Sequence, residues 1–138
     1  MTTFKDTAEV YAIQGGFLDW ITKDPALRPK FVGSNTSFLV SYSDPPARIL
    51  VDCTQDPPVV TCDPPADTVA EITLKMGADE GHKFWQGQLN LTSAMARRKV
   101  SIGGSMPKAL KLLPAMRPAF GRYKAFLREN GHEDKVIA

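Results

Sequence analysis

The chain has 138 residues, of which 43% are hydrophobic and 23% are charged, and its formal net charge is +2. This length favours one domain, and the composition is ordinary for a soluble globular protein. No apolar run approaches the ~20 residues that span a bilayer, and neither end carries a secretory or peroxisomal signal. We therefore expect a single cytoplasmic domain over residues 1–138, with its core at about 5–128 and a polar tail at 130–138.

The two cysteines, Cys53 and Cys62, are too few for a disulfide scaffold or a structural zinc site. They fall on neighbouring predicted strands, so a cross-strand pair stays open. In a reducing compartment the favoured interpretation is two small buried apolar residues.

The first predicted element is a helix from residue 6 to about 23. Val10, Ile13 and Phe17 recur at helical spacing, and the pattern continues to residue 21. Gly15 and Gly16 each weaken this helix by about 1 kcal/mol relative to alanine, which suggests close packing against a neighbour. An Asp-Pro step at residues 24–25 ends the helix, and residues 25–30 are expected to add one further turn.

Residues 37–76 show the alternation of strands that have one buried and one wet face. The segments lie at about 37–42, 48–53, 59–62 and 69–76. In the last one Ile72, Leu74 and Met76 share a face. This pattern predicts a largely antiparallel sheet with helices on a single side, in a two-layer α+β fold. Prolines on both sides of residues 59–62 make that segment the predicted edge strand.

Asp-Pro-Pro occurs three times, beginning at Asp44, Asp56 and Asp63. The unequal spacings exclude a repeat architecture, and aspartate before proline favours turns. A calcium site is the functional alternative, but these loops lack the alternating ligand spacing of an EF-hand. Hairpin turns are the favoured interpretation.

The next residues predict two short helices. The first, at 78–87, buries Phe84 and Trp85 and carries Asp79 and Glu80 at its positive end. The second, at 91–96, is expected to be capped by Asn90.

A final strand and further helices complete the prediction. Val100 and Ile102 alternate as in a half-buried strand, which ends at two glycines. Ser105 is expected to cap a helix after them. Pro114 and Pro118 are expected to break this region into two helices, the second at about 119–129.

Catalytic chemistry finds little support in the sequence. There is no Gly-x-Ser-x-Gly elbow, no Cys–His candidate with local context and no His-Glu-x-x-His. His82 and His132 are expected to be solvated surface residues. The Gly103-Gly104-Ser105 step could cradle an anion such as a CoA phosphate, although a strand-to-helix turn explains it better. We expect no enzyme, no metal and no cofactor.

An ordered set of features between Val69 and Met116 resembles the sterol carrier protein type two family of lipid-binding domains, as a free-standing copy. The set begins with the strand at 70–76 and an acidic helix start. It continues with Gly87-x-Leu89-Asn90, with Ala94-Met95, and with Lys99-x-x-Ile102-x-Gly104 before a Leu-rich helix. The sequence departs from the family's usual proline at Leu91, phenylalanine at Met95, glycine at Arg98 and acidic residue at Ser105.

The resemblance implies a five-stranded sheet with helices on one face and an apolar tunnel between the layers. It also implies non-enzymatic binding and transfer of a sterol, a fatty acid or a fatty acyl-CoA. Four of the five methionines follow residue 75, which suits an adaptable cavity of some 300–1,000 Å³, although ordinary core packing is the alternative. The expected ligand-binding residues are Phe84, Leu89, Met95, Ile102, Met106, Leu110, Leu113, Met116 and Phe120.

Charge is distributed unevenly: nine basic residues and no acidic one lie between Arg97 and Arg128. A solvated face, an anionic membrane surface and nucleic acid are the three interpretations. Nucleic acid is disfavoured because no recognition motif is present and the nearby aromatic residues are needed for packing. The residues assigned to a transient membrane or phosphate contact are Lys108, Lys111, Arg117, Arg122 and Lys124.

Two alternatives to a lipid carrier stay open. One is an accessory or dimerisation module with a vestigial cavity, and the other is a small enzyme that acts on acyl-CoA. The ligand, the oligomeric state and the physiological pathway are left open by the sequence.

Overall fold

A five-stranded sheet organises the protein. The computed structural model describes residues 3–136, apart from the side chains at positions 91 and 113–115. The strands are β1 (Ser37–Ser43), β2 (Ala47–Asp52), β3 (Val59–Cys62), β4 (Ile72–Gly77) and β5 (Val100–Gly104), in the order β3-β2-β1-β4-β5. The β1–β4 pair is parallel and the other pairs are antiparallel. The predicted α+β fold with a mostly antiparallel sheet is therefore confirmed.

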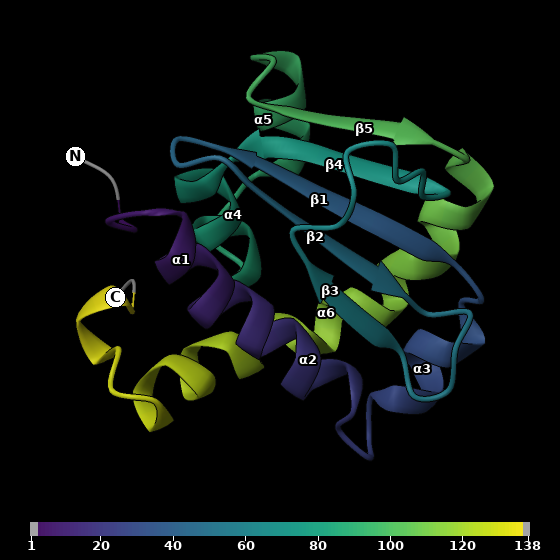
Figure 1. Ribbon diagram of the computed structural model, residues 1–138, viewed down its shortest axis with the longest axis horizontal. Coiled ribbons are helices and arrows are strands. Elements are labelled where there is room, and N and C mark those ends of the chain that lie inside the picture. Colours follow the sequence, from purple (N-terminus) through teal and green to yellow (C-terminus); the bar gives the residue numbers. More distant parts are fainter. Residues whose placement is uncertain (1–2, 137–138) are drawn as a thin grey trace.

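Helices form the second layer. They are α1 (Thr7–Val10), the π-helical turn η1 (Tyr11–Gly15), α2 (Gly16–Thr22), α3 (Arg28–Gly33), α4 (Ala78–Trp85), α5 (Leu91–Ala96), α6 (Met106–Glu129) and the 3-10 turn η2 (Glu133–Lys135). Figure 1 shows α6 crossing behind the sheet, from the end of β5 to the N-terminal helices. Within residues 3–136, no helix is both long enough and apolar enough to cross a bilayer.

The strand register separates an apolar face from a polar one. One row across four strands is Ile49, Val40, Leu74 and Ile102, and it faces the helices. The next row is Arg48, Ser41, Lys75 and Ser101, and it lies on the opposite face. Side chains alternate between faces along a strand, so the helices cover one face of the sheet. The segment between β3 and β4 covers part of the other face, where Leu39 is buried and Arg48 Nη1 donates to the Pro64 carbonyl.

The prediction that residues 59–62 form an edge strand is confirmed, because β3 lies at one end of the strand order. Cys62 at its end is exposed, so the expectation that both cysteines are buried is wrong for this residue. Cys53 is buried. The residue opposite Cys62 on the neighbouring strand is Ile49, and not Cys53 as a cross-strand cysteine pair would require. Both thiols are free.

The N-terminal helical stretch approaches its neighbours closely through its two glycines. A Cβ atom on Gly15 would lie 2.6 Å from the Sγ of Cys62, and one on Gly16 would lie 3.5 Å from the Phe126 ring. The short separation at Gly15 explains a residue of low helix propensity there, whereas the separation at Gly16 is an ordinary van der Waals contact. Close packing that excludes a side chain is thus confirmed at Gly15. The following helix, α3, starts at residue 28, later than expected.

The prediction that Pro114 and Pro118 divide the last region into two helices is wrong, because α6 is continuous for 24 residues. A proline inside a helix costs about 3 kcal/mol. Leu112, Met116 and Tyr123 are buried at helical spacing on both sides of the prolines. Burial of such side chains contributes about 1.5–3 kcal/mol each, so three of them are comparable to the penalty of the two prolines.

A chain of hydrogen bonds runs through the core and joins the sheet to three helical segments. Tyr42 Oη on β1 donates to Gln14 Oε1 at 2.7 Å, and Gln14 Nε2 donates to Tyr123 Oη on α6 at 2.8 Å. Trp85 Nε1 on α4 donates to Tyr42 Oη at 3.3 Å. Burial raises the pKa of both tyrosines above the ordinary value, so their hydroxyls stay protonated as donors.

His82 completes this chain, and its prediction as a solvated surface residue is wrong, because it is only 3% exposed. Its Nε2 lies 2.7 Å from the Lys135 carbonyl, which can only accept, so Nε2 carries the proton. Its Nδ1 therefore accepts from Tyr123 Oη, 2.9 Å away. Phe4 packs edge-on against the imidazole ring at 5.4 Å. Burial lowers the pKa of His82, and the neutral imidazole is the form that fits.

The segment expected to be a polar tail folds back against α1 and α4. The η2 turn supplies the carbonyl of Lys135 that His82 requires, and Lys135 Nζ lies 3.7 Å from a carboxylate oxygen of Glu9. The C-terminal residues described here therefore satisfy a polar group of the core.

Replacement of Tyr123 by phenylalanine tests the buried chain of hydrogen bonds. The change leaves Gln14 Nε2 and His82 Nδ1 without their partner, so we expect the free energy of unfolding to fall by about 1–3 kcal/mol. Urea denaturation measures the loss. Tyr11→Phe is the control, because its half-buried hydroxyl accepts a single bond from the Arg48 amide. Equal losses in both variants would contradict the role given to the buried chain.

The depressed pKa of His82 predicts a loss of stability in mild acid. The unfolded state takes up a proton below about pH 6.5, before the folded state does, so stability falls as the pH drops through that value. Unfolding measured at pH 7.5 and 5.5 should show a smaller pH dependence in His82→Gln than in the unmodified protein. The control His132→Gln should keep the full dependence, and a loss in both would refute the assignment to His82.

Candidate functional site

An apolar cavity lies between α6 and the strands β4 and β5. Its volume is about 70 Å³, and every lining side chain is apolar. The lining residues are Ile72, Leu74, Met76, Phe84, Val100, Ile102, Met106, Ala109, Leu110, Leu112 and Met116. A cavity without polar groups attracts hydrocarbon and offers water no hydrogen bonds.

Five of the nine predicted ligand-binding residues meet in this cavity. They are Phe84, Ile102, Met106, Leu110 and Met116.

The other four predicted residues lie elsewhere or are not described. Phe120 packs behind the cavity, with its ring centroid 5.1 Å from that of Phe84. Leu89 is partly buried and lines a separate polar cleft. Met95 is exposed on α5, at the opposite end of β5 from α6 (Figure 1). The side chain of Leu113 lies outside the part of the chain that the structure describes.

Strand residues were the main omission from the predicted lining. Ile72 and Leu74 line the cavity from β4 and Val100 lines it from β5, whereas Met76 was already among the methionines expected to suit a cavity. The signal was present in the sequence, since these residues share the alternating apolar face of their strands. The prediction instead favoured helix residues and methionines.

The expected cavity of 300–1,000 Å³ is wrong in size, because the observed volume is about 70 Å³. Leu112 and Met116 on α6 are buried and occupy much of the space between the two layers. A site for a drug-sized ligand commonly holds 300 Å³ or more. The observed cavity is therefore too small to enclose a long hydrocarbon chain.

The cavity continues to the surface through two exposed apolar side chains. Met106 and Leu110 line it, and they are 54% and 64% exposed. They lie one turn apart at the start of α6, so they share a face of the helix. The apolar lining therefore continues from the cavity to the protein surface at this point.

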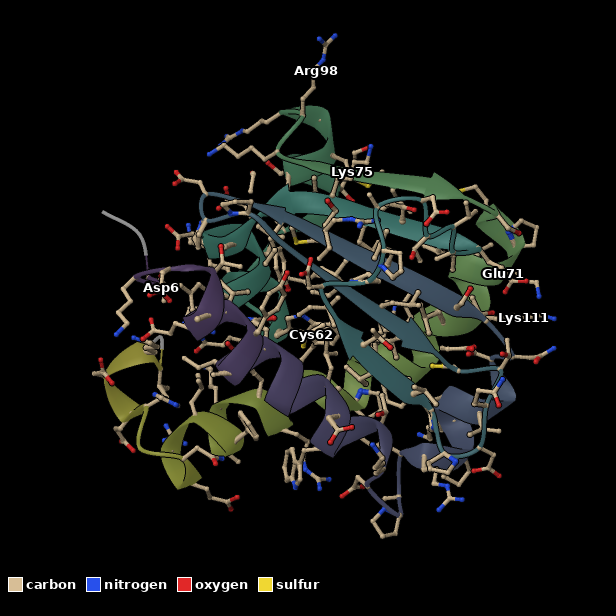
Figure 2. All side chains as sticks on the ribbon, viewed as in Figure 1. Asp6, Cys62, Glu71, Lys75, Arg98 and Lys111 are labelled. Carbon is tan, nitrogen blue, oxygen red and sulfur yellow. The ribbon has the colours of Figure 1, made fainter. Side chains whose placement is uncertain are left out.

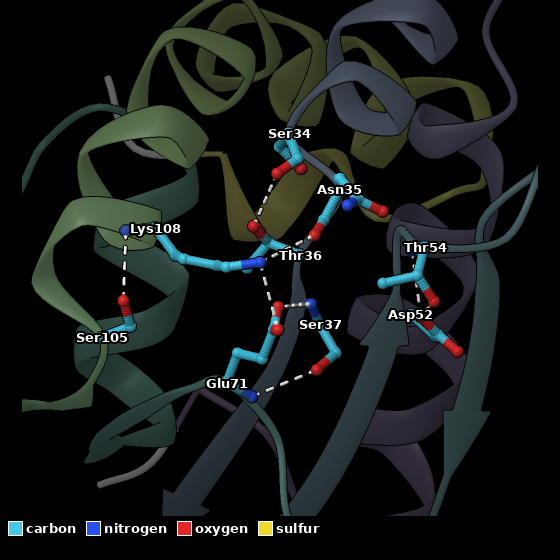
Figure 3. A network of polar contacts seen from close by, with 9 residues as sticks. All are labelled: Ser34, Asn35, Thr36, Ser37, Asp52, Thr54, Glu71, Ser105 and Lys108. Atoms are coloured by element: carbon cyan, nitrogen blue, oxygen red, sulfur yellow. Dashed lines mark hydrogen bonds and ion pairs between the residues drawn. The ribbon is translucent and has the colours of Figure 1, made fainter.

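The first turn of α6 is attached to the sheet by the polar contacts in Figure 3. Lys108 Nζ lies 3.1 Å from Glu71 Oε1 and donates to the Asn35 carbonyl at 3.4 Å. Glu71 also accepts from the Ser37 amide, and the Ser105 amide donates to the Glu71 carbonyl at 3.0 Å. The Lys108–Glu71 ion pair is partly exposed, so it contributes at most about 1 kcal/mol. The start of α6 is thus held by modest contacts.

The Gly103-Gly104-Ser105 step serves the turn and not an anion. Gly104 has φ +97°, and a Cβ atom there would lie 2.1 Å from the Glu71 carbonyl oxygen. Only glycine fits this position. Ser105 Oγ accepts from the Lys108 amide as the helix cap, and its own amide already donates to Glu71.

The five cations assigned to a membrane contact divide into two groups. Lys108 pairs with Glu71, and Arg122 pairs with Asp24 at 2.6 Å while its guanidinium lies 5.6 Å from the centre of the Trp20 ring. Lys111, Arg117 and Lys124 have no ion pair among the residues described. The first two are exposed and the third is half-buried.

Metal chemistry has no assembled donor set within residues 3–136. No group of three or more His, Cys, Asp or Glu side chains there is placed to hold an ion.

Comparison with known proteins identifies the fold. The model of the SCP-2 sterol transfer family matches residues 17–117, and no curated protein matches the chain. The sterol carrier protein domain 2 of Helicoverpa armigera has 18% identity and a TM-score of 0.67, over 82% of this chain and 89% of that one.

Two further solved structures share the fold. Palmitated SCP2L2 from Aedes aegypti has 16% identity and a TM-score of 0.55, over 78% of this chain and 94% of that one. A stereoselective inverting sec-alkylsulfatase from Pseudomonas sp. has 16% identity and a TM-score of 0.51, over 62% of this chain but only 13% of that one.

Removal of the Lys108–Glu71 ion pair should loosen the start of α6. In Lys108→Met we expect amide hydrogen exchange at residues 108–112 to accelerate about threefold, since the pair contributes at most about 1 kcal/mol. Exchange followed by NMR measures the change. Lys111→Met, which removes an unpaired lysine from the same helix, is the control. Unchanged exchange in Lys108→Met would show that the ion pair does not hold the helix.

Proposed function

Because the chain belongs to the SCP-2 sterol transfer family, we propose that it is a non-enzymatic carrier that binds a lipid in the apolar cavity and releases it to an acceptor. The observation that carries the proposal is the continuity between the cavity and the exposed side chains of Met106 and Leu110. Transfer needs a site that shields hydrocarbon from water and opens to the surface, and this arrangement supports both.

Entry of the ligand would separate the first half of α6 from β4 and β5. The cost comprises the partly exposed Lys108–Glu71 ion pair and the apolar contacts of Leu112 and Met116, which are buried in the closed form. A bound hydrocarbon chain would replace those apolar contacts, since each buried CH₂ group contributes about 0.8 kcal/mol. The three methionines of the lining, Met76, Met106 and Met116, adapt to an irregular ligand through their flexible side chains.

The chemistry of the lining favours a hydrocarbon chain or ring system with its polar group outside. Charged side chains are absent from the residues that line the cavity. A buried carboxylate or phosphate would therefore lack a partner, which is costly. The polar head would lie at the surface near Met106 and Leu110. A fatty acid, a fatty acyl-CoA and a sterol all combine an apolar body with a polar group at one end. The palmitated Aedes aegypti relative supports an acyl chain.

A transient contact with an anionic membrane would accompany loading and release. Lys111 and Arg117 are exposed on α6, which also carries Met106 and Leu110. Each cation near an anionic surface contributes about 1 kcal/mol, and apolar side chains add to this by insertion at the boundary.

An accessory role is the second candidate. The volume of about 70 Å³ is small for a resident lipid, and the Pseudomonas sulfatase contains a similar fold within a much longer chain. In that case the exposed pair Met106 and Leu110 would pack against another protein instead of a lipid. A binding measurement separates the two candidates.

A charge at the cavity entrance should abolish lipid binding without unfolding the protein. Leu110 is 64% exposed, so Leu110→Asp leaves the new carboxylate in water while it blocks the apolar path. A fluorescent fatty acid titrated against the protein should bind with saturation, and the variant should bind at least about tenfold more weakly. Val59→Asp, the same change at an exposed apolar residue of β3, is the control. Absence of saturable binding to the unmodified protein would favour the accessory role.

Association with vesicles should depend on charge and on salt. Binding to anionic vesicles should weaken steeply as salt is added, because surface charges are screened within about 10 Å at 0.1 M. Lys111→Glu with Arg117→Glu should reduce binding without lowering stability, since both side chains are exposed. Co-sedimentation measures it, with Lys5→Glu and Lys30→Glu as controls. Equal binding to neutral and anionic vesicles at every salt concentration would exclude the membrane contact.

A further inference from the structure

The sheet face opposite the helices carries a second, polar site. A cleft of about 310 Å³ lies across the ends of β1 and β4 and the start of β5, on the face opposite the apolar cavity. We define the serine–lysine cleft by five side chains from these strands and the turn before β5. They are Ser41, Ser43, Lys75, Lys99 and Ser101.

The strand register explains how these side chains meet. Ser41 lies beside Lys75 in the parallel β1–β4 pair, and Lys75 lies beside Ser101 in the antiparallel β4–β5 pair. Neighbouring strands are about 4.8 Å apart, so the hydroxyls of Ser41 and Ser101 lie on either side of the Lys75 side chain. Two residues further along the same face, Ser43 lies beside Gly77. Continuation of the β4–β5 register places Lys99 opposite Gly77 from the other side.

Glycine at position 77 makes the site concave. The two rows are Ser41–Lys75–Ser101 and Ser43–Gly77–Lys99, and the middle of the second row has no side chain. Lys75, Lys99 and Ser101 are exposed, and these two lysines have no ion pair within residues 3–136. The structure therefore presents two free ammonium groups and three hydroxyls around a recess.

From this arrangement we propose that the serine–lysine cleft binds a phosphate group, as a phosphate monoester or diester. Hydroxyls and ammonium groups are donors that match the several acceptor oxygens of a phosphate, and charged donors strengthen such bonds. A phospholipid headgroup and a soluble phosphate ester share this chemistry.

Two nearby charged residues refine the proposal. Arg98 contributes positive charge from the turn before β5, but its side chain extends away from the fold (Figure 2). Glu80 lies on α4, and its Oε1 is 3.3 Å from the position that a Cβ atom of Gly77 would occupy. The Glu80 carboxylate repels an anion bound in the serine–lysine cleft, so removal of its charge should strengthen phosphate binding.

A titration with pyrophosphate at constant ionic strength, followed by ¹⁵N NMR, tests the site. We expect saturable shifts confined to amides at residues 41–43, 75–77 and 99–101. Lys75→Gln with Lys99→Gln should weaken binding about tenfold, and Glu80→Gln should tighten it about threefold, because each change alters the local charge. The control pair Lys5→Gln and Lys30→Gln makes the same change of net charge elsewhere and should have no effect.

Shifts that grow without saturation, shifts that map to α6, or equal weakening by the control pair would overturn the proposal. Vesicles of phosphatidylglycerol and of phosphatidylcholine distinguish the source of the phosphate. Weaker co-sedimentation of the Lys75→Gln, Lys99→Gln variant with both vesicle types supports a lipid headgroup. Unchanged co-sedimentation, together with loss of pyrophosphate binding, supports a soluble ester. Lipid binding in the cavity on the other face should be unaffected, so failure of this proposal is distinct from failure of the carrier function.

Discussion

The buried hydrogen-bond chain from Trp85 through Tyr42, Gln14 and Tyr123 to His82 is the constraint on which the rest of the structure depends. Each member is buried and its donor or acceptor is paired with another member, so the elements that carry them keep their relative positions. The chain fixes the C-terminal half of α6 against the sheet and the N-terminal helices. The first half of α6 has no such buried polar chain and is held by partly exposed polar contacts and by the buried apolar side chains of Leu112 and Met116.

This difference between the two halves of α6 bears on the proposed function. The apolar cavity lies under the first half, and the exposed residues Met106 and Leu110 line it toward the surface. A carrier has to open without unfolding, and a helix anchored at one end satisfies that requirement. Under the proposed function, the cavity of about 70 Å³ would be the closed form of a site that widens around its ligand.

Much of this was readable from the sequence, for identifiable physical reasons. Alternation along β4 predicted its buried face, and Asn90 and Ser105 cap their helices as their side chains dictate. The burial of His82 was missed because its partners, Tyr123 and the Lys135 carbonyl, lie 41 and 53 residues away in the chain. Pro114 and Pro118 were misread because local propensity says nothing of the tertiary burial that holds α6 together. The cavity volume depends on side-chain packing, which no periodicity encodes.

Native mass spectrometry of the intact protein tests the carrier function most directly. The protein is stripped of lipid by organic extraction, refolded, and offered palmitate and a sterol in separate experiments. We predict a single adduct at one ligand per chain with at least one of them, absent from Leu110→Asp and retained in Val59→Asp. A refolded protein that acquires no adduct at saturating lipid would contradict the account.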